Sequence, residues 1–251
     1  MHKFDLAVLG FAAALLSAGA LFSTGTMAAA GPAKPRAKAS LPVKTDWNAT
    51  VTRTPQGTHV LGNPAAKVRL TEFVSYTCSH CAQFHEEADG ALRANFVAPG
   101  KAAVEVRHFV RDPVDLTVAL LTNCGTPAKF FANHSAFMWG QTKWIGPLSN
   151  PSAAQAARWS SGTFAQRTKV IAKDFGFYSI MAGRGYTVQQ VDKCLADRAL
   201  ADRLAADTDL AQRTLRVTGT PSFAIDGAVL AGTHNWDLLR PQLDARLRTG
   251  G

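Results

Sequence analysis

The stretch that decides the fold is EFVSYTCSHCAQF, residues 72–84, in which two residues separate Cys78 from Cys81. The apolar pattern from Lys67 to Ser75 predicts a strand that becomes fully buried toward its C-terminal end. A helix is predicted from Cys78 to Asn95. The two cysteines are therefore expected where a buried strand meets a helix.

This position favours a reactive thiol. The unpaired N–H groups and the dipole at a helix N-terminus stabilise a thiolate, and a protonated His80 would add a positive neighbour in the same turn. Both effects lower the pKa of Cys78 and make it the attacking or leaving sulfur. Cys81 lies one turn further into the helix, where it would be more buried and would act as the resolving sulfur.

Other roles for the Cys-x-x-Cys pair are a structural disulfide, a zinc site or chance. A zinc site needs about four ligands, and His80 and His85 are the candidates near Cys78 and Cys81. The chain has no second Cys-x-x-Cys pair to complete a finger or ribbon. A redox-active pair is the favoured interpretation.

The remaining patterns predict an α/β fold interrupted by helices. A second strand over 104–110 gives a strand–helix–strand unit, with parallel strands and a right-handed crossover. Residues 113–215 have helical periodicity throughout. A hairpin follows, with strands over 222–225 and 228–231, and a last helix is expected from Asn235 to Leu247.

Composition and the N-terminal segment predict an exported globular protein. The chain has 251 residues, of which 47% are hydrophobic, and a formal net charge of +9. The uncharged stretch Leu6–Phe22 and the small residues 28–30 indicate a signal peptide over 1–30, with an uncleaved anchor as the alternative. Residues 31–58 are interpreted as a basic, proline-rich linker with one short strand ending near Val60. The basic residues are scattered, so no nucleic-acid partner is expected.

Thr220-Pro221 directly precedes the predicted hairpin, and on local sequence it is compatible with an ordinary loop proline. At this point a resemblance becomes specific. The run 72–84 resembles the active-site segment of the DsbA-type thiol–disulfide oxidoreductases of the bacterial cell envelope. The element order is similar too: residues 59–112 and 216–251 correspond to the two parts of a thioredoxin fold. Residues 113–215 correspond to an inserted helical domain.

The resemblance implies roles for individual residues. Cys78 matches the nucleophilic cysteine and Cys81 the resolving one. Pro221 matches the cis-proline beside the cysteine pair, and Thr220 would offer backbone groups to an extended substrate. Glu72 matches a buried acid that relays a proton to the buried thiol, the alternative being an outward-facing strand residue.

The implied activity is oxidation of reduced, unfolded polypeptides by a periplasmic or envelope protein without a cofactor. A membrane quinone-linked partner would reoxidise it, and we expect a monomer. Ser79 replaces the proline of the best-known oxidases, and Thr220 resembles the isomerase branch, so an isomerase or reductase is the alternative. The isomerase branch dimerises through a separate N-terminal domain, and residues 31–60 are too few to form one. An oxidase is therefore the favoured interpretation. A noncatalytic metal-binding module that uses the two cysteines, His80 and His85 is an alternative of a different class.

Cys124 and Cys194 are the remaining cysteines, 70 positions apart. In an oxidising compartment two leftover cysteines usually pair, so a structural disulfide is predicted. Closing that loop stabilises a fold by roughly 4 kcal/mol on the chain-entropy estimate. A regulatory disulfide is the functional alternative.

Overall fold

The computed structural model describes residues 45–249. The predicted signal peptide over 1–30 and the first part of the predicted linker lie outside these residues. Among the helices of the described range, none combines the length and the apolar character needed to cross a membrane.

A six-stranded sheet forms the centre of the fold, in the order β1-β2-β4-β3-β5-β6. β3 and β4 are parallel, and the other neighbouring strands are antiparallel. This confirms the predicted strand–helix–strand unit and the hairpin that follows the helices. The strands are β1 Val51–Arg53, β2 His59–Gly62, β3 Val68–Val74, β4 Ala102–His108, β5 Ser222–Ile225 and β6 Ala228–Val229.

The sheet begins inside the range that was interpreted as a linker. β1 lies within residues 31–58 and pairs with β2, with Val51 opposite Leu61. β2 is buried along its whole length and pairs with β4, so it is an inner strand of the sheet. The sequence therefore folds into two strands where one short strand ending near Val60 was expected.

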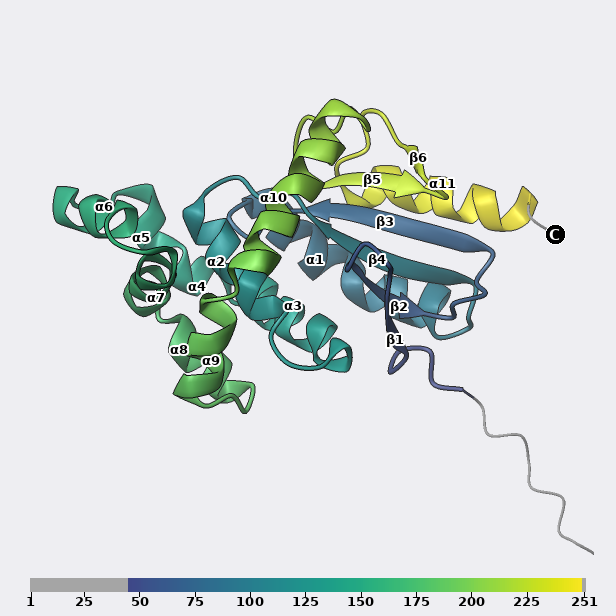
Figure 1. Cartoon of the computed structure of the whole chain (residues 1–251). Helices are drawn as coiled ribbons and strands as arrows, with labels where there is room; N and C mark the ends of the chain where they lie inside the picture. Colours follow the sequence, from purple (N-terminus) through teal and green to yellow (C-terminus); the bar gives the residue numbers. More distant parts are fainter. Residues whose placement is uncertain (1–44, 250–251) are drawn as a thin grey trace, which may run out of the picture. The chain divides into compact units, whose positions relative to one another are not determined.

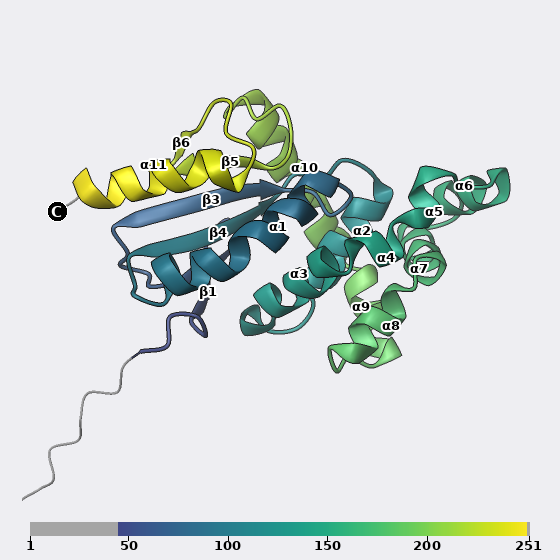
Figure 2. The ribbon, with the colours of Figure 1, turned by 180° about the vertical axis from the view of Figure 1, so that it is seen from behind.

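Helices cover both faces of the sheet. α1 and α11 lie over one face (Figure 2), and α10 crosses the other (Figure 1). The helices α4 to α9 lie together beyond one end of the central strands, whereas α3 lies beside α1 and contacts β2. The helices are α1 Ser79–Leu92, α2 Pro113–Thr122, α3 Phe130–Trp139, α4 Gln141–Trp144, α5 Gly146–Ser149, α6 Ala153–Ser160, α7 Phe164–Asp174, α8 Phe177–Gly183, α9 Val188–Leu195, α10 Arg198–Arg213 and α11 Trp236–Thr249, with a π-helical turn Arg93–Val97 after α1 and a 3-10 turn Pro127–Lys129 before α3.

The alternation of side chains along β3 decides what lies beneath α1. Successive strand residues point to opposite faces, so Leu70, Glu72 and Val74 share one face. Leu70 and Val74 belong to the large apolar cluster that contains the buried side of α1. Phe73 belongs to a separate cluster on the other face, with Ala211 of α10. Glu72 is thereby held in an apolar layer and is only 6% exposed.

The inserted helices share one hydrophobic core with the sheet. The cluster beneath α1 continues through α2, α3 and α7 to α10 without a break. Asp112 caps the first helix of the block, accepting hydrogen bonds from the backbone N–H groups of Val114 and Asp115. Because an aspartate cap followed by proline starts a helix well, the predicted boundary after residue 112 coincides with the start of α2.

Cys124 and Cys194 form a disulfide, which confirms the predicted pairing. It joins the segment after α2 to α9, across 70 positions of the sequence. Cys124 is buried, whereas Cys194 is half-buried.

Candidate active site

Cys78 is the N-cap residue of α1, with an extended backbone conformation. Both Cys78 and Cys81 are free thiols, and their exposed fractions are 5% and 0%. The N–H groups of Cys81 and Ala82 donate to the carbonyl of Cys78. The first turn of the helix therefore fixes both sulfur-bearing residues at the end of β3, as the sequence predicted.

A buried carboxyl holds the turn that leads from β3 into α1. Asp115 accepts hydrogen bonds from the Ser75 hydroxyl (2.6 Å) and from the backbone N–H of Tyr76 (2.8 Å) and Arg111 (3.0 Å). Burial raises the pKa of Asp115 to about 7, and these three donors oppose that rise. The carboxyl thus links the turn before the cysteines to the start of the inserted helices.

Gln141 fixes the same turn from the other side. Its amide donates to the carbonyl oxygens of Tyr76 (2.7 Å) and Cys78 (2.9 Å). The Thr77 hydroxyl donates to the carboxylate of Asp112 at 2.6 Å. Residues from α2 and α4 therefore determine where the Cys78 backbone lies.

The Thr220-Pro221 peptide bond is cis and lies beside the cysteine pair. Antiparallel pairing of β3 with β5 brings this loop to the end of β3. The thiol of Cys78 donates to the Thr220 carbonyl at 3.1 Å. The His234 imidazole donates from Nδ1 to the Pro221 carbonyl at 2.8 Å and so holds the loop in place.

Hydrogen-bond donors lower the pKa of Cys78 to about 4. The largest cause is a hydrogen bond with the Cys81 thiol, and burial opposes it. The Thr220 side chain and the backbone N–H groups of Cys81 and His80 lower the pKa further. The Thr220 carbonyl favours the protonated thiol, but the donors outweigh it. Cys78 is therefore a thiolate at neutral pH.

The pKa of Cys81 is shifted in the opposite direction, upward. Burial raises the pKa of Cys81 well above its usual value, and the neighbouring Cys78 and Glu72 raise it further. The two sulfurs of one turn therefore differ in charge at neutral pH: Cys78 is ionised and Cys81 keeps its proton.

Glu72 lies beneath the cysteines as a neutral acid. Burial raises the pKa of Glu72 to about 8, and the nearby charge of Asp89 contributes. Its position among the apolar residues of β3 rules out the outward-facing alternative. A buried acid with a pKa near neutrality can give up and take back a proton close to Cys81.

A small cavity lies between Glu72 and polar groups of α1 and of the π-helical turn after it. It has a volume of about 20 Å³, room for about one water molecule. Its lining includes Glu72, His85, Asp89 and Arg93. His85 is buried, and its Nε2 has no hydrogen-bond partner among the described residues. A water in this cavity would have polar neighbours on several sides.

The structure brings together Glu72, Cys78, Cys81, Thr220 and Pro221 as the sequence suggested. His80 acts on Cys78 through its backbone N–H, and its side chain is exposed. Sequence reasoning missed three residues that support the site, and only the helix-starting Asp-Pro pair offered a signal. They are Asp112, Asp115 and Gln141.

The chain matches the family described as thioredoxin over residues 54–245. A solved structure titled protein-disulfide isomerase, from Novosphingobium aromaticivorans, is 59% identical, with a TM-score of 0.73 over 76% of this chain and 97% of that one. The chain belongs to the thioredoxin family.

Two less similar proteins resemble this chain, one in its DsbA-type fold and one in its sequence. The structure of Wolbachia pipientis alpha-DsbA1 is 21% identical and has a TM-score of 0.63, covering 77% of this chain and 92% of that one. A Rickettsia typhi protein assigned by name to the protein-disulfide oxidoreductases is 27% identical over 67% of this chain. The chain spans 54% to 60% of the length of such Rickettsia relatives.

Titration of the reduced protein tests the ionisation of Cys78. The ultraviolet absorbance of a thiolate should appear with a midpoint near pH 4, because hydrogen-bond donors hold the pKa of Cys78 at about 4. Cys78→Ser should abolish this step, whereas Cys81→Ala should shift it to higher pH by removing the largest donor. A midpoint near the ordinary thiol value, with no change in Cys78→Ser, would contradict this electrostatic account.

Glu72→Gln tests the buried acid through stability. The folded-state pKa of about 8 lies above the ordinary value of 4.5, so the wild type loses stability as pH rises between them. Relative to wild type, the variant should gain about 3 kcal/mol of unfolding free energy between pH 4.5 and pH 7. Urea denaturation measures this difference. Glu86→Gln, which changes an exposed residue of α1, is the control, and equal pH profiles for all three proteins would refute a buried neutral Glu72.

Proposed function

We propose that the protein is an exported thiol–disulfide oxidoreductase that donates its Cys78–Cys81 disulfide to reduced, unfolded polypeptides. The observation that carries this proposal is the set of donors that lowers the pKa of Cys78 to about 4. Stabilising the thiolate stabilises the reduced protein, and a stable reduced form makes the oxidised form a strong oxidant.

The first step is attack by a substrate thiolate on Cys78. A bond forms between the substrate sulfur and Cys78 Sγ, the Cys78–Cys81 bond breaks, and the electron pair moves to Cys81. The Cys81 sulfur is buried and favours its protonated form. Glu72 is positioned to supply that proton and to recover one through the neighbouring cavity.

The second step releases the oxidised substrate. A second substrate thiolate attacks the substrate sulfur of the mixed disulfide, and Cys78 leaves with its electron pair. Because its pKa is low, Cys78 is the better leaving group of the two cysteines. The substrate loses two electrons and gains one disulfide, and Cys78 and Cys81 end as reduced sulfurs.

The cis-proline loop is proposed to position the substrate. The Thr220 carbonyl lies 3.1 Å from the Cys78 sulfur, so a chain paired with this loop would pass over the reactive sulfur. An extended polypeptide gains backbone hydrogen bonds from such pairing whatever its sequence. This mode of binding suits unfolded substrates of many sequences.

Export to the cell envelope and reoxidation by a membrane quinone-linked protein complete the proposal. The Cys124–Cys194 disulfide supports an oxidising compartment, because disulfides persist there and are rare in the cytosol. The quinone-linked partner is proposed on the resemblance to DsbA-type proteins. We propose that the working form is a monomer.

Disulfide isomerisation is the second candidate. The Novosphingobium protein that is 59% identical is titled a protein-disulfide isomerase, and Thr220 resembles the isomerase branch. An isomerase uses the reduced Cys78 thiolate to attack wrong disulfides, so the same low pKa serves it. The two activities differ in which redox state of the protein starts the reaction.

The test compares both redox states on one substrate. The oxidised protein, added to a reduced and denatured ribonuclease in stoichiometric amount, should restore disulfides while Cys78 and Cys81 become reduced. Cys78→Ser should abolish the transfer, and mass spectrometry of the trapped thiols measures it.

The reduced protein, added to ribonuclease with scrambled disulfides, should recover little activity in the same time. The opposite result, with slow transfer from the oxidised form and fast recovery with the reduced form, would replace the oxidase by an isomerase. Failure of both reactions would overturn the assignment as an oxidoreductase.

A further inference from the structure

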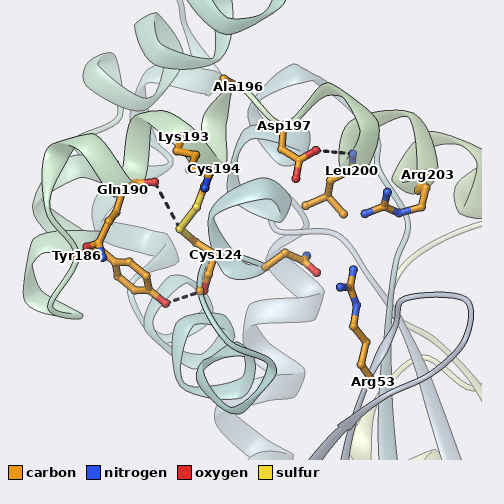
Figure 3. A pocket seen from close by; sticks show the side chains of 12 residues that line it. Arg53, Cys124, Tyr186, Gln190, Lys193, Cys194, Ala196, Asp197, Leu200 and Arg203 are labelled. Atoms are coloured by element: carbon orange, nitrogen blue, oxygen red, sulfur yellow. Dashed lines mark hydrogen bonds between the residues drawn. A yellow bond between two sulfur atoms is a disulfide. The ribbon is translucent and has the colours of Figure 1, made fainter.

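A large pocket lies between β1 and the helices α9 and α10. Its volume of about 710 Å³ falls in the range of small-molecule sites. Arg53 enters from β1, Lys193 from α9 and Arg203 from α10, while the Cys124–Cys194 disulfide forms part of the wall (Figure 3).

The pocket carries an excess of positive charge. Its lining contains Arg53, Lys193 and Arg203 against a single acid, Asp197. The Asp197 carboxylate is used as the cap of α10, accepting from the backbone N–H of Leu200 at 2.8 Å. A net positive lining attracts an anion into an otherwise solvent-filled space.

The side chains of Arg53 and Arg203 point toward the same hollow (Figure 3). Within residues 45–249, neither Arg53 nor Arg203 forms an ion pair. Asp207, whose ionisation Arg203 favours, forms its ion pair with Arg107. Two guanidinium groups that face one hollow repel each other, and a bound carboxylate would offset that repulsion.

The disulfide in the pocket wall indicates which functional group the ligand carries, because a disulfide reacts with thiols. Cys124 and Cys194 both line the pocket, and Cys194 is the less buried of the two residues. A thiol bound among the arginines would lie next to a sulfur that it can attack. Small thiols of cells commonly carry carboxylates, which guanidinium groups bind well.

We propose that this pocket binds an anionic low-molecular-weight thiol through Arg53, Lys193 and Arg203, and directs it to the Cys124–Cys194 disulfide. The thiolate of the ligand attacks Cys194 Sγ and forms a mixed disulfide with it. The Cys124–Cys194 bond breaks, and its electron pair moves to Cys124, which leaves as a thiolate. The ligand is oxidised and Cys124 is reduced, so atoms and electrons balance.

This site is separate from the cysteine pair of α1. Arg203 lies near the start of α10, whereas the loop that carries the cis-proline follows the other end of that helix, after Arg213. The ten residues from Arg203 to Arg213 span roughly 15 Å of helix. The proposal does not rest on chemistry at Cys78, and both proposals can be tested without each other.

The experiment uses the full chain with Cys78→Ser and Cys81→Ser, in which Cys124–Cys194 is the disulfide left to react. It is treated with glutathione, which is anionic, or with cysteamine, which is cationic. Alkylation and mass spectrometry then measure the rate of opening and locate the mixed disulfide. Rates for a small model disulfide correct for the intrinsic reactivity of each thiol.

Arg53→Gln/Arg203→Gln should lower the glutathione-to-cysteamine rate ratio roughly tenfold, as expected for two partly exposed charge pairs. Arg213→Gln/Arg240→Gln removes the same charge from exposed positions outside the pocket and should leave the ratio unchanged. An equal fall in both variants would overturn the proposal, because overall charge would then explain it. A first mixed disulfide with glutathione on Cys124 instead of Cys194 would also overturn it.

A competition experiment tests the same binding in the protein that keeps Arg53 and Arg203, in case the pocket variant does not fold. Citrate carries carboxylates but no thiol, so at matched ionic strength it should slow the reaction with glutathione more than the reaction with cysteamine. Equal rates with and without citrate would contradict binding of an anion in the pocket.

Discussion

The structure depends on the hydrogen bonds that reach the Cys78 sulfur at the start of α1. A thiolate this well buried is stable only where donors replace water, and here they come from the Cys81 thiol, the Thr220 side chain and the first backbone N–H groups of the helix. Each donor has to be held in place by other parts of the chain. Asp115 and Gln141 hold the turn before the helix, and β5 brings Thr220 to it.

The active site contains neighbouring groups whose pKa values are shifted in opposite directions. Donors lower the pKa of Cys78, whereas burial raises the pKa values of Cys81 and Glu72. Pairs of neighbouring groups whose pKa values are pushed apart separate the roles of acid and base. Here the separation gives one sulfur that leaves as an anion, one that keeps its proton, and a carboxyl that can carry a proton between Cys81 and a small cavity.

Local patterns in the sequence were sufficient for the reactive pair and its immediate frame. Helix onset at Cys78 and the hairpin after Pro221 follow from residues close together in the chain, and the resemblance to DsbA-type proteins added the cis-proline. The burial of Glu72 was expected only from the resemblance, and the structure explains it, because Glu72 shares a face of β3 with Leu70 and Val74. Asp115 and Gln141 could not be predicted, because their hydrogen bonds cross 39 to 65 positions and leave no periodic signal.

The most direct test of the account compares the stability of the two redox states. Urea denaturation at pH 7, with the Cys124–Cys194 disulfide intact in both forms, should give the larger free energy of unfolding for the form in which Cys78 and Cys81 are reduced. Because the folded-state pKa of Cys78 is about 4 and its ordinary value is 9.0, this advantage should be lost as the pH falls toward 4. An oxidised form that is the more stable at pH 7, as for an ordinary structural disulfide, would contradict the account.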